Sequence, residues 1–550
     1  MPRSTGLKTA FVGAIVLPTV VQAQVIFATI ARNGASGTVA NGLPAGAYFS
    51  SFNGLSIDRH GSVLVRASGS HDLNGPSRGV WHLGTPNSAS PQFLVYNSPT
   101  TGLPAGANWL EVDRTAFTHD LAGSSYINYS ASFSTNPQGG GFRQALWHGP
   151  AGNQQMLAYQ GMAASEIGTG VTIGSIGDGS PSINPRMYAG GNSISFVGLL
   201  DGSGINSSNR STIWAATSSS GLALVARQGD QAVGLPAGSV YGDVVTRLNM
   251  SDSGAIAFYS TYTVGGVVQG QGVWSGRPTG TGGAGLQLFA KSGDAISSSE
   301  SGVVFGQFVT PKLNSQGRVS FSATLQGAGV GSSNDVVMVS GTPGNLQVVA
   351  REGDQAPGVP VGLKYGNGFN ILSVADTGRT LFRVQLSDST SCIYSADPGQ
   401  SPQLVMRSTQ PVPGYPGSTL VSVGAVMNTE GIITWDINAI DPLGRLGSHS
   451  ILAPDPSGNM TLVAKTGQLI EYAPGVFDTI DELTYLTTLG EDGRQVFSAS
   501  GTLLISARLR NAASQSNMHI LTARVVPAPS AGLCVLLGSL FATRRRSRSR

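Results

Sequence analysis

Three aspartates recur at one position of a repeated sequence and are the first candidates for chemistry. Each ends a Gly-Asp pair and is followed by uncharged residues; they are Asp230, Asp294 and Asp354. Carboxylate oxygens are preferred ligands of Ca²⁺, so such a row could hold calcium on one rim of a repeat protein. A calcium loop, however, gathers several carboxylates or carbonyls within a few residues. The pattern therefore favours aspartates that cap their own turns, with calcium ligation as the alternative.

Catalytic chemistry has weaker support in the sequence. Glycosidases use paired carboxylates, but spacing selects no pair among the available Asp243, Glu300, Glu352 and Glu482. The 7 histidines show no metal-ligand spacing, and no nucleophile elbow, phosphate-binding loop or metalloprotease motif occurs. Cys392, on a predicted strand, is interpreted as a small buried apolar residue. The sequence thus assigns no catalytic residue and indicates a non-enzyme more than an enzyme.

Tryptophans are the remaining candidates for ligand contact. Those on equivalent predicted strands are Trp81, Trp147, Trp214 and Trp274. Their regular recurrence between apolar neighbours favours packing between repeats over display to sugars. Trp109 falls outside this register, in a segment rich in Gly and Ala that we expect to be a loop. Trp109 is therefore the residue assigned to ligand binding.

A long internal repeat must position these residues. Residues 226–258 return at the same length as residues 350–382, with Arg-x-Gly-Asp, Gly-x-Pro-x-Gly and Tyr-Gly at matching places. The first of these belongs to an end motif, resembling Leu-x-x-Val-Ala-Arg-x-Gly-Asp, that recurs about every 60 residues from Ala31 to Ala523. Eight such intervals fill the chain, or seven if the degenerate second and seventh copies are not separate units.

Each unit is typical of four short antiparallel strands. Turns such as residues 314–317 separate alternating apolar segments, a third strand carries Gly-Val-Trp or a relative, and a fourth runs into the end motif. Four strands per unit are typical of a propeller blade. Blades that stack in a closed ring bury their faces against one another and leave no free sheet edge. We expect an all-β fold, a β-propeller of about eight (or seven) four-stranded blades. A two-sheet β-solenoid is the alternative, although its repeats are normally shorter.

The two ends of the chain predict export. Arg3 and Lys8 precede an apolar run over residues 10–21, and Ala23 closes a site of the kind that signal peptidase cleaves. Residues 1–23 are therefore predicted to be a signal peptide, and residues 24–524 the repeat domain. Residues 525–550 form a predicted sorting or anchor tail, with an apolar stretch before terminal arginines. Its apolar stretch is short for a permanent span, so we expect transient membrane contact.

Composition argues against nucleic acid as a partner. Charged residues make up 11% of the chain, whereas Gly is abundant at 76 residues. The formal net charge of +3 is more than supplied by the arginines of residues 544–550, so the body is near neutral or slightly acidic. Nucleic-acid binding needs a basic face, which this body does not provide.

Both the tail and the repeat resemble known bacterial families. Val526-Pro527-Ala528-Pro529 before the apolar stretch resembles PEP-CTERM sorting tails, although Ala528 stands where that family usually has Glu. This resemblance implies an exosortase-type sorting enzyme as a partner. Residues 249–258, NMSDSGAIAF, and residues 314–321, NSQGRVSF, resemble the units of tandem NxxGxxAF-repeat proteins. That family implies an exported, envelope-attached protein and brings no catalytic residues.

Two functional hypotheses follow for a protein at the cell surface or outside the cell. The first is a non-catalytic, surface-anchored structural or binding component of the envelope or extracellular matrix. The second is an extracellular propeller that binds or cleaves carbohydrate, with a polysaccharide as partner. An enzyme should gather carboxylates and aromatic residues at one mouth of the ring, and a scaffold should not.

Overall fold

The structure is a computed structural model of the chain. It describes residues 24–33, 48–69, 77–84, 92–96, 103–104, 106–119, 125–135, 142–150, 153–177, 187–217, 220–244, 248–296, 302–309, 311–412, 417–440, 446–455, 457–484 and 497–526. The predicted signal peptide and nearly all of the predicted tail lie outside these ranges. Every regular element within them is a β-strand. The described part accordingly contains no helix of the length and apolarity that a membrane crossing requires.

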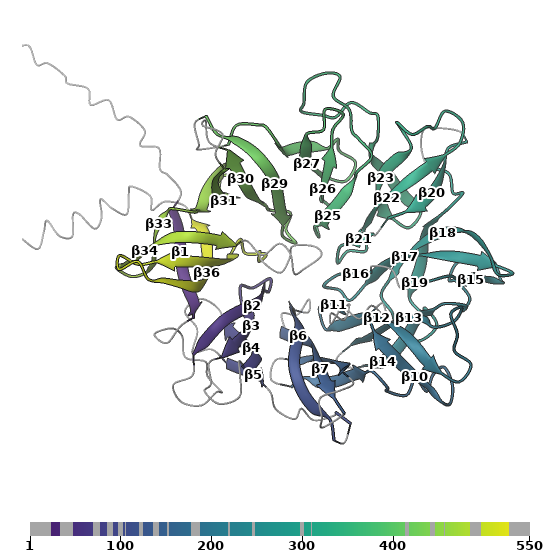
Figure 1. Ribbon diagram of the computed structural model, residues 1–550. Helices are drawn as coiled ribbons and strands as arrows, with labels where there is room; N and C mark the ends of the chain where they lie inside the picture. Colours follow the sequence, from purple (N-terminus) through teal and green to yellow (C-terminus); the bar gives the residue numbers. More distant parts are fainter. Residues whose placement is uncertain are drawn as a thin grey trace, which may run out of the picture.

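The strands form eight antiparallel sheets set around a common centre as the blades of a propeller (Figure 1). One strand of each blade lies nearest the centre, and the others follow outward to the rim. The prediction of an all-β propeller with about eight blades is confirmed, and the seven-blade and β-solenoid alternatives are wrong.

The first four blades are formed by consecutive strands. Blade 1 contains β2 (Phe49–Ile57), β3 (Val63–Gly69), β4 (Ser77–Gly84) and β5 (Gln92–Tyr96), and blade 2 contains β6 (Asn108–His119), β7 (Ser125–Ser134), β8 (Phe142–Pro150) and β9 (Gln155–Tyr159). Blade 3 contains β10 (Val171–Ile176), β11 (Met187–Gly190), β12 (Ser193–Gly202), β13 (Ser211–Thr217) and β14 (Ser220–Arg227). Blade 4 contains β15 (Ser239–Tyr241), β16 (Asn249–Met250), β17 (Ile256–Val264), β18 (Val267–Gly276) and β19 (Leu286–Lys291).

The remaining blades continue the pattern, with one exception at the end. Blade 5 contains β20 (Val304–Phe308), β21 (Lys312–Leu313), β22 (Val319–Gln326), β23 (Val336–Thr342) and β24 (Asn345–Arg351), and blade 6 contains β25 (Asn370–Val374), β26 (Thr380–Gln385), β27 (Ser391–Ala396) and β28 (Gln403–Arg407). Blade 7 contains β29 (Thr419–Met427), β30 (Ile433–Ile440), β31 (Leu446–Pro454) and β32 (Met460–Lys465). Blade 8 contains β33 (Leu469–Ala473), β34 (Val476–Thr484), β35 (Leu503–Arg510), β36 (Ser516–Val526) and the first strand of the chain, β1 (Gln24–Arg32). In blades 3 to 5 the innermost strand is split into two segments that pair with the same neighbour.

The ring is closed by β1, which is the outermost strand of the last blade. It pairs antiparallel with β36, from Gln24 opposite Val526 to Arg32 opposite His519. The interpretation of Thr522-Ala523-Arg524 as the last end motif is therefore wrong. In blade 8 the four usual strand positions are filled by β34, β35, β36 and β1, so β36 holds the third position and β1 the fourth. The end motif of that blade is Ala31-Arg32, at the other end of the chain. Pairing with β1 also covers the edge that β36 would otherwise expose.

The core lies between the blades, and stacked aromatic pairs form its centre. Blades 2, 3, 4 and 6 each place one ring on the second strand opposite one on the third. The pairs and their centroid distances are Tyr129–Trp147 at 5.1 Å, Phe196–Trp214 at 6.5 Å, Phe258–Trp274 at 5.8 Å and Phe382–Tyr394 at 5.7 Å. Trp81 and the three paired tryptophans are at most 2% exposed. The prediction that these rings pack between blades is confirmed.

The asparagine of the Asn-x-x-Gly turn joins each blade that carries it to the next. In blade 5 the Asn314 Oδ1 accepts the N–H of Gln316 at 3.1 Å and of Arg318 at 2.9 Å. Its Nδ2 donates to the carbonyl of Ala375 in blade 6 at 2.8 Å. Asn428 does the same for blades 7 and 8. One amide thus caps its own turn and bonds the neighbouring blade, a reason for asparagine at this position.

The end motif forms a second joint between blades. The N–H of Gly229, after blade 3, donates to the carbonyl of Tyr241 in blade 4 at 2.8 Å, and Tyr241 returns a bond to the carbonyl of Asp230 at 2.9 Å. Gly229 has a φ of 89° and the equivalent Gly353 has 83°, a conformation that suits glycine. The motif is therefore a backbone connector with a glycine at its bend.

Blade 6 offers a test of this connector, because its end motif carries threonine where glycine is expected. Thr409 has a φ of 75° and makes the same joint, donating to the carbonyl of Leu420 at 2.8 Å. A β-branched residue in this region costs about 1–2 kcal/mol. We expect Thr409→Gly to raise the free energy of unfolding by about 1 kcal/mol, since glycine's greater chain entropy offsets part of the gain. Urea unfolding measures this; a substituted protein of equal or lower stability would contradict the role assigned to the glycine.

Candidate functional site

The repeated aspartates are turn residues. The Asp294 carboxylate accepts the backbone N–H of Lys291 at 2.9 Å and forms an ion pair with the Lys291 Nζ at 2.7 Å. Gln410 and Gln468 occupy the same position in later repeats and accept the equivalent N–H with their amide oxygens. Because the uncharged amide of glutamine accepts the same N–H, the shared role of this position is that of a hydrogen-bond acceptor for its own turn. Among the described residues, no three His, Cys, Asp or Glu side chains are placed to hold a metal ion.

The other predicted aspartates are placed the same way on separate blades. Burial raises the pKa of the Asp230 carboxyl, against the effect of nearby Arg227. Asp354 is exposed, and its carbonyl accepts the N–H of Tyr365 at 3.0 Å. The backbone joint is thus the same at all three positions, because the carbonyls of Asp230 and Asp294 likewise accept the N–H of Tyr241 and Phe305 from the next blade.

Trp109 lies on a strand and not in a loop. It is the second residue of β6, and its backbone pairs with Phe133 of β7. The segment was expected to be a loop because Gly and Ala precede it, but pairing with β7 extends the strand back to Asn108. The side chain of Trp109 is outside the described atoms, so its assignment to ligand binding stays a prediction.

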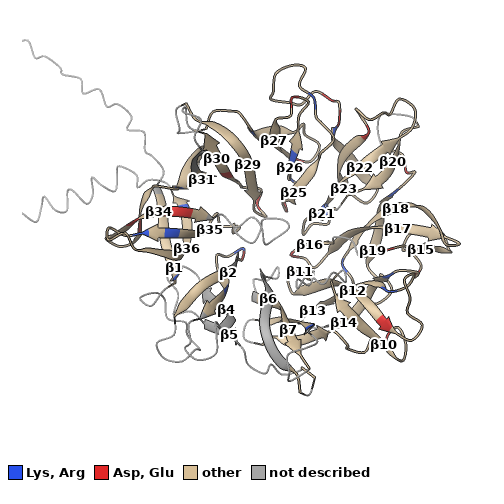
Figure 2. Ribbon diagram, viewed as in Figure 1, with Lys and Arg blue, Asp and Glu red and all other residues tan. Residues whose placement is uncertain are grey.

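The three described carboxylates among those considered for glycoside cleavage lie on different blades. Asp243, Glu352 and Glu482 belong to blades 4, 5 and 8, and Glu300 lies outside the described residues. Figure 2 shows the acidic residues of the described chain spread over the ring. Glu482 forms an ion pair with Arg508 at 3.3 Å. Burial and the neighbouring Asp335 raise the pKa of the Glu352 carboxyl.

Buried histidines join neighbouring blades, a role that the sequence analysis missed. His148 of blade 2 bonds the carbonyl of Asn192 in blade 3 at 2.9 Å, and burial lowers its pKa. His449 of blade 7 bonds the carbonyl of Leu483 in blade 8 at 2.7 Å, and its hydrogen bond to Asp436 raises its pKa. Each imidazole thus has partners on two blades and a structural role.

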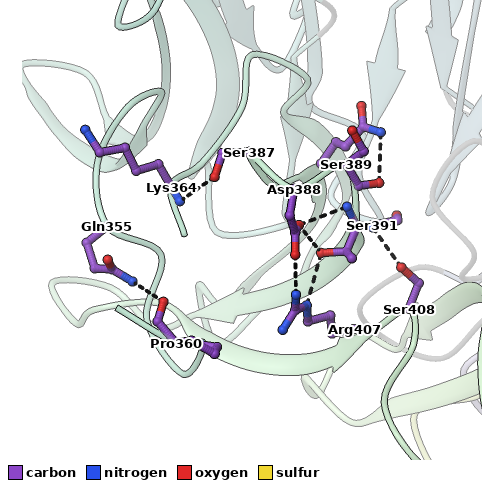
Figure 3. A network of polar contacts seen from close by, with 11 residues as sticks. Gln355, Pro360, Lys364, Ser387, Asp388, Ser389, Ser391, Arg407 and Ser408 are labelled. Atoms are coloured by element: carbon purple, nitrogen blue, oxygen red, sulfur yellow. Dashed lines mark hydrogen bonds and ion pairs between the residues drawn. The ribbon is translucent and has the colours of Figure 1, made fainter. Parts of the chain in front are cut away.

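Arginines of the end motif fix the loop between the second and third strands of their own blade. In blade 6, Arg407 donates from Nε to the Thr390 Oγ1 at 3.0 Å and pairs with Asp388 (Figure 3). Thr390 in turn donates its hydroxyl at 2.6 Å and its N–H at 3.0 Å to the same carboxylate. The hydroxyl bond above all, and the other bonds with it, lower the pKa of Asp388. The Nε of Arg227 and that of Arg351 bond backbone carbonyls of the equivalent loops. These arginine side chains therefore stabilise the loops of their own blades.

The polar side chains described so far bond other parts of the ring, but a polar cavity lies between blades 5 and 6. We call this cavity the 5–6 pocket. Its volume is about 560 Å³. Arg318, Ser340 and Thr380 line its inner part, β24 contributes Gln347 and Val348, and the segment after β27 contributes residues 396–402. The pocket thus lies where two blades meet. Charged and hydroxyl-bearing residues are part of its lining, and its walls contain both polar and apolar residues.

Arg318 is the unusual residue of the 5–6 pocket. Its side chain makes one hydrogen bond, from Nη1 to the Ser340 Oγ at 3.3 Å, and no described carboxylate lies within ion-pair distance. Burial lowers its pKa. Ser320 links the hydroxyls of the pocket, at 2.8 Å to Ser340 and 3.0 Å to Thr380. The arrangement presents a half-buried cation, held by buried hydroxyl groups, which suits binding of a small anion.

Comparison with known proteins identifies the family. The family model described as a family of unknown function, DUF7453, matches residues 22–302 and 127–532. The chain belongs to this family. No curated protein matches the chain.

The solved structures that resemble the chain share little sequence with it. The β-propeller domain of the Trilobed protease from Pyrococcus furiosus is 8% identical, with 76% of this chain and 96% of that chain covered and a TM-score of 0.32. The lectin SapL1, solved with alpha methyl fucoside, is 12% identical, with 64% and 95% covered and a TM-score of 0.24. An alpha-l-arabinofuranosidase from Fusarium graminearum is 9% identical, with 62% and 93% covered and a TM-score of 0.27. At these values no activity or ligand is transferred to this chain.

Proposed function

We propose that this protein is an exported, non-catalytic propeller that acts as a binding or structural component at the cell surface or in the extracellular matrix. One observation carries the proposal: the recurring polar residues bond the ring to itself. Asn314 and Asn428 join blades, Asp294 caps a turn, and Arg407 fixes a loop. Their recurrence therefore needs no catalytic explanation, and the 5–6 pocket offers a place for a ligand such as an extracellular polysaccharide.

Export is supported by where the propeller begins. Strand β1 starts at Gln24, directly after the predicted cleavage point at Ala23. Removal of residues 1–23 by signal peptidase would leave every strand of blade 8 intact. We further propose that the tail after Val526 makes transient membrane contact and is a substrate for an exosortase-type sorting enzyme.

The proposal is tested by fractionating cells of the native host that produce the full chain. We expect a mature N-terminus at Gln24 by mass spectrometry and most of the protein at the cell surface. A matched chain that ends at Val526 should be released into the medium, because it lacks the tail. A cytoplasmic protein that retains residues 1–23 would overturn the proposal.

A further inference from the structure

We infer that the 5–6 pocket binds the carboxylate of an acidic sugar, a uronic acid, through Arg318. The inference rests on the proposed binding role and names its ligand class. Two neighbouring blades of the ring carry an equivalent arginine, and only one of these blades supplies a carboxylate to it.

Arg318 and Arg379 occupy the same position in blades 5 and 6, directly after the glycine of the turn between the first two strands. Beyond them, Val319 pairs with Gly341 and Thr380 pairs with Ala396. The next position along the third strand is therefore Thr342 in blade 5 and Asp397 in blade 6. Blade 5 thus has the arginine without the aspartate.

Blade 6 shows how this arginine binds a carboxylate. The Arg379 Nε donates to the Asp397 Oδ1 at 2.8 Å, and its Nη2 donates to Oδ2 at 2.9 Å. This two-point contact raises the pKa of the guanidinium and lowers that of the Asp397 carboxyl. On Arg318 the same Nε–Nη2 edge has no hydrogen-bond acceptor among the residues that the structure describes, because its one side-chain bond there uses Nη1. A ligand carboxylate fits this edge as Asp397 fits Arg379.

The rest of the pocket favours a sugar as the carrier of that carboxylate. The exposed Gln347 can bond ring hydroxyls, whereas Val348 and Pro398 offer apolar contact to ring carbons. The volume of about 560 Å³ suits a small molecule rather than a protein segment. Asp397 also lines the pocket, but Arg379 holds its charge, so the local field stays favourable to an anion.

Isothermal titration calorimetry on the mature chain tests the inference with glucuronate and galacturonate as probes. Glucose, galactose and inorganic phosphate are the comparison ligands. We expect both uronates to bind at least about tenfold more tightly than the neutral sugars, since a charge-assisted contact is lost without the carboxylate. If an oligogalacturonide binds more tightly than galacturonate, the natural ligand is a polysaccharide. If the two bind with equal affinity per sugar unit, the natural ligand is the free sugar. Phosphate binding tighter than either uronate would overturn the sugar assignment.

The variant Thr342→Asp supplies the missing carboxylate from the protein itself. It should lower uronate affinity at least about tenfold with little change in thermal stability, because the same Arg–Asp pair exists in blade 6. Arg318→Gln should lose binding as well, and Lys364→Gln, which removes one positive charge elsewhere on blade 6, should bind as the natural protein does.

Unchanged uronate affinity in folded Thr342→Asp and Arg318→Gln would overturn the inference. So would equal binding of neutral sugars and uronates. Failure of uronate binding by a protein that is exported and held at the surface would reject the ligand class alone. A cytoplasmic location would reject the proposed function instead, so the two failures are distinguishable.

Discussion

A chain that begins at Gly34 instead of Gln24 will be destabilised by about 3 kcal/mol or more and will associate in solution. The deletion removes β1, the outermost strand of blade 8. Ala31 of this strand is fully buried in a core shared with Trp81 of blade 1 and Leu504 of blade 8. The loss of such packing costs a few kcal/mol, and the uncovered edge of β36 can pair with other chains.

The measurement is thermal unfolding by circular dichroism together with size-exclusion chromatography, with the chain from Gln24 as the control. An excess of a peptide of residues 24–33 should restore part of the lost stability, since it can refill the position of β1. A truncated chain that stays monomeric and unfolds at the same temperature as the control would show that β1 does not close the ring.

The second large effect is a loss of stability in mild acid, caused by His519. This histidine on β36 is 1% exposed, and its ring lies 4.9 Å from that of Tyr472. Burial, assisted by the charge of Arg32, lowers its pKa to about 4. In the unfolded chain its pKa is about 6.5.

The sign of the effect follows from these two pKa values. Between pH 6.5 and 4 the unfolded chain takes up a proton that the folded chain refuses, so acid favours unfolding. The contribution of His519 is complete above pH 6.5 and falls as the pH drops, by about 3 kcal/mol in total. At pH 5 about 2 kcal/mol of it should be gone.

Urea unfolding of the natural protein and of His519→Gln at pH 7.5 and pH 5 isolates this effect from other titrations. Glutamine has no proton to gain in this range and can still bond the Thr29 hydroxyl that lies 3.3 Å from the ring. The difference in unfolding free energy between the two proteins should narrow by about 2 kcal/mol at pH 5. Parallel pH profiles would rule out a buried neutral imidazole at this position.

The blades were predictable because the information that defines them is local and repeated. Alternating apolar segments, turn glycines such as Gly317 and the recurring Trp274 position together predict four strands and a packed aromatic face. The role of β1 was not predictable in this way, since Ala28 pairs with Thr522 near the opposite end of the chain. The sequence did contain one signal of this role. Ala31-Arg32 is an end motif, but no blade precedes it in the chain to which it could belong.

The candidate site was missed because no local motif marks it. Arg318 follows a turn glycine and is followed by an apolar strand, as solvated residues at strand ends often are. What distinguishes it is the residue across the sheet, which is Thr342 in blade 5 and Asp397 in blade 6. Comparison of whole repeats position by position, rather than a search for catalytic motifs, would have found this difference. Trp109 was misplaced for a related reason, because composition alone suggested a loop where pairing with β7 forms a strand.

The central claim is that the repeated residues hold the ring together and that binding resides where one repeat lacks a partner. Its most direct test is to measure thermal unfolding and glucuronate affinity on the same samples of Asn428→Ala and Thr342→Asp. Asn428 is 1% exposed and bonds the carbonyl of Ser498 in the next blade at 2.9 Å, so its loss should cost about 2 kcal/mol or more and leave affinity unchanged. Thr342→Asp should show the reverse, with a normal unfolding temperature and at least about tenfold weaker binding. An Asn428→Ala protein of normal stability, or a Thr342→Asp protein of normal affinity, would contradict the account.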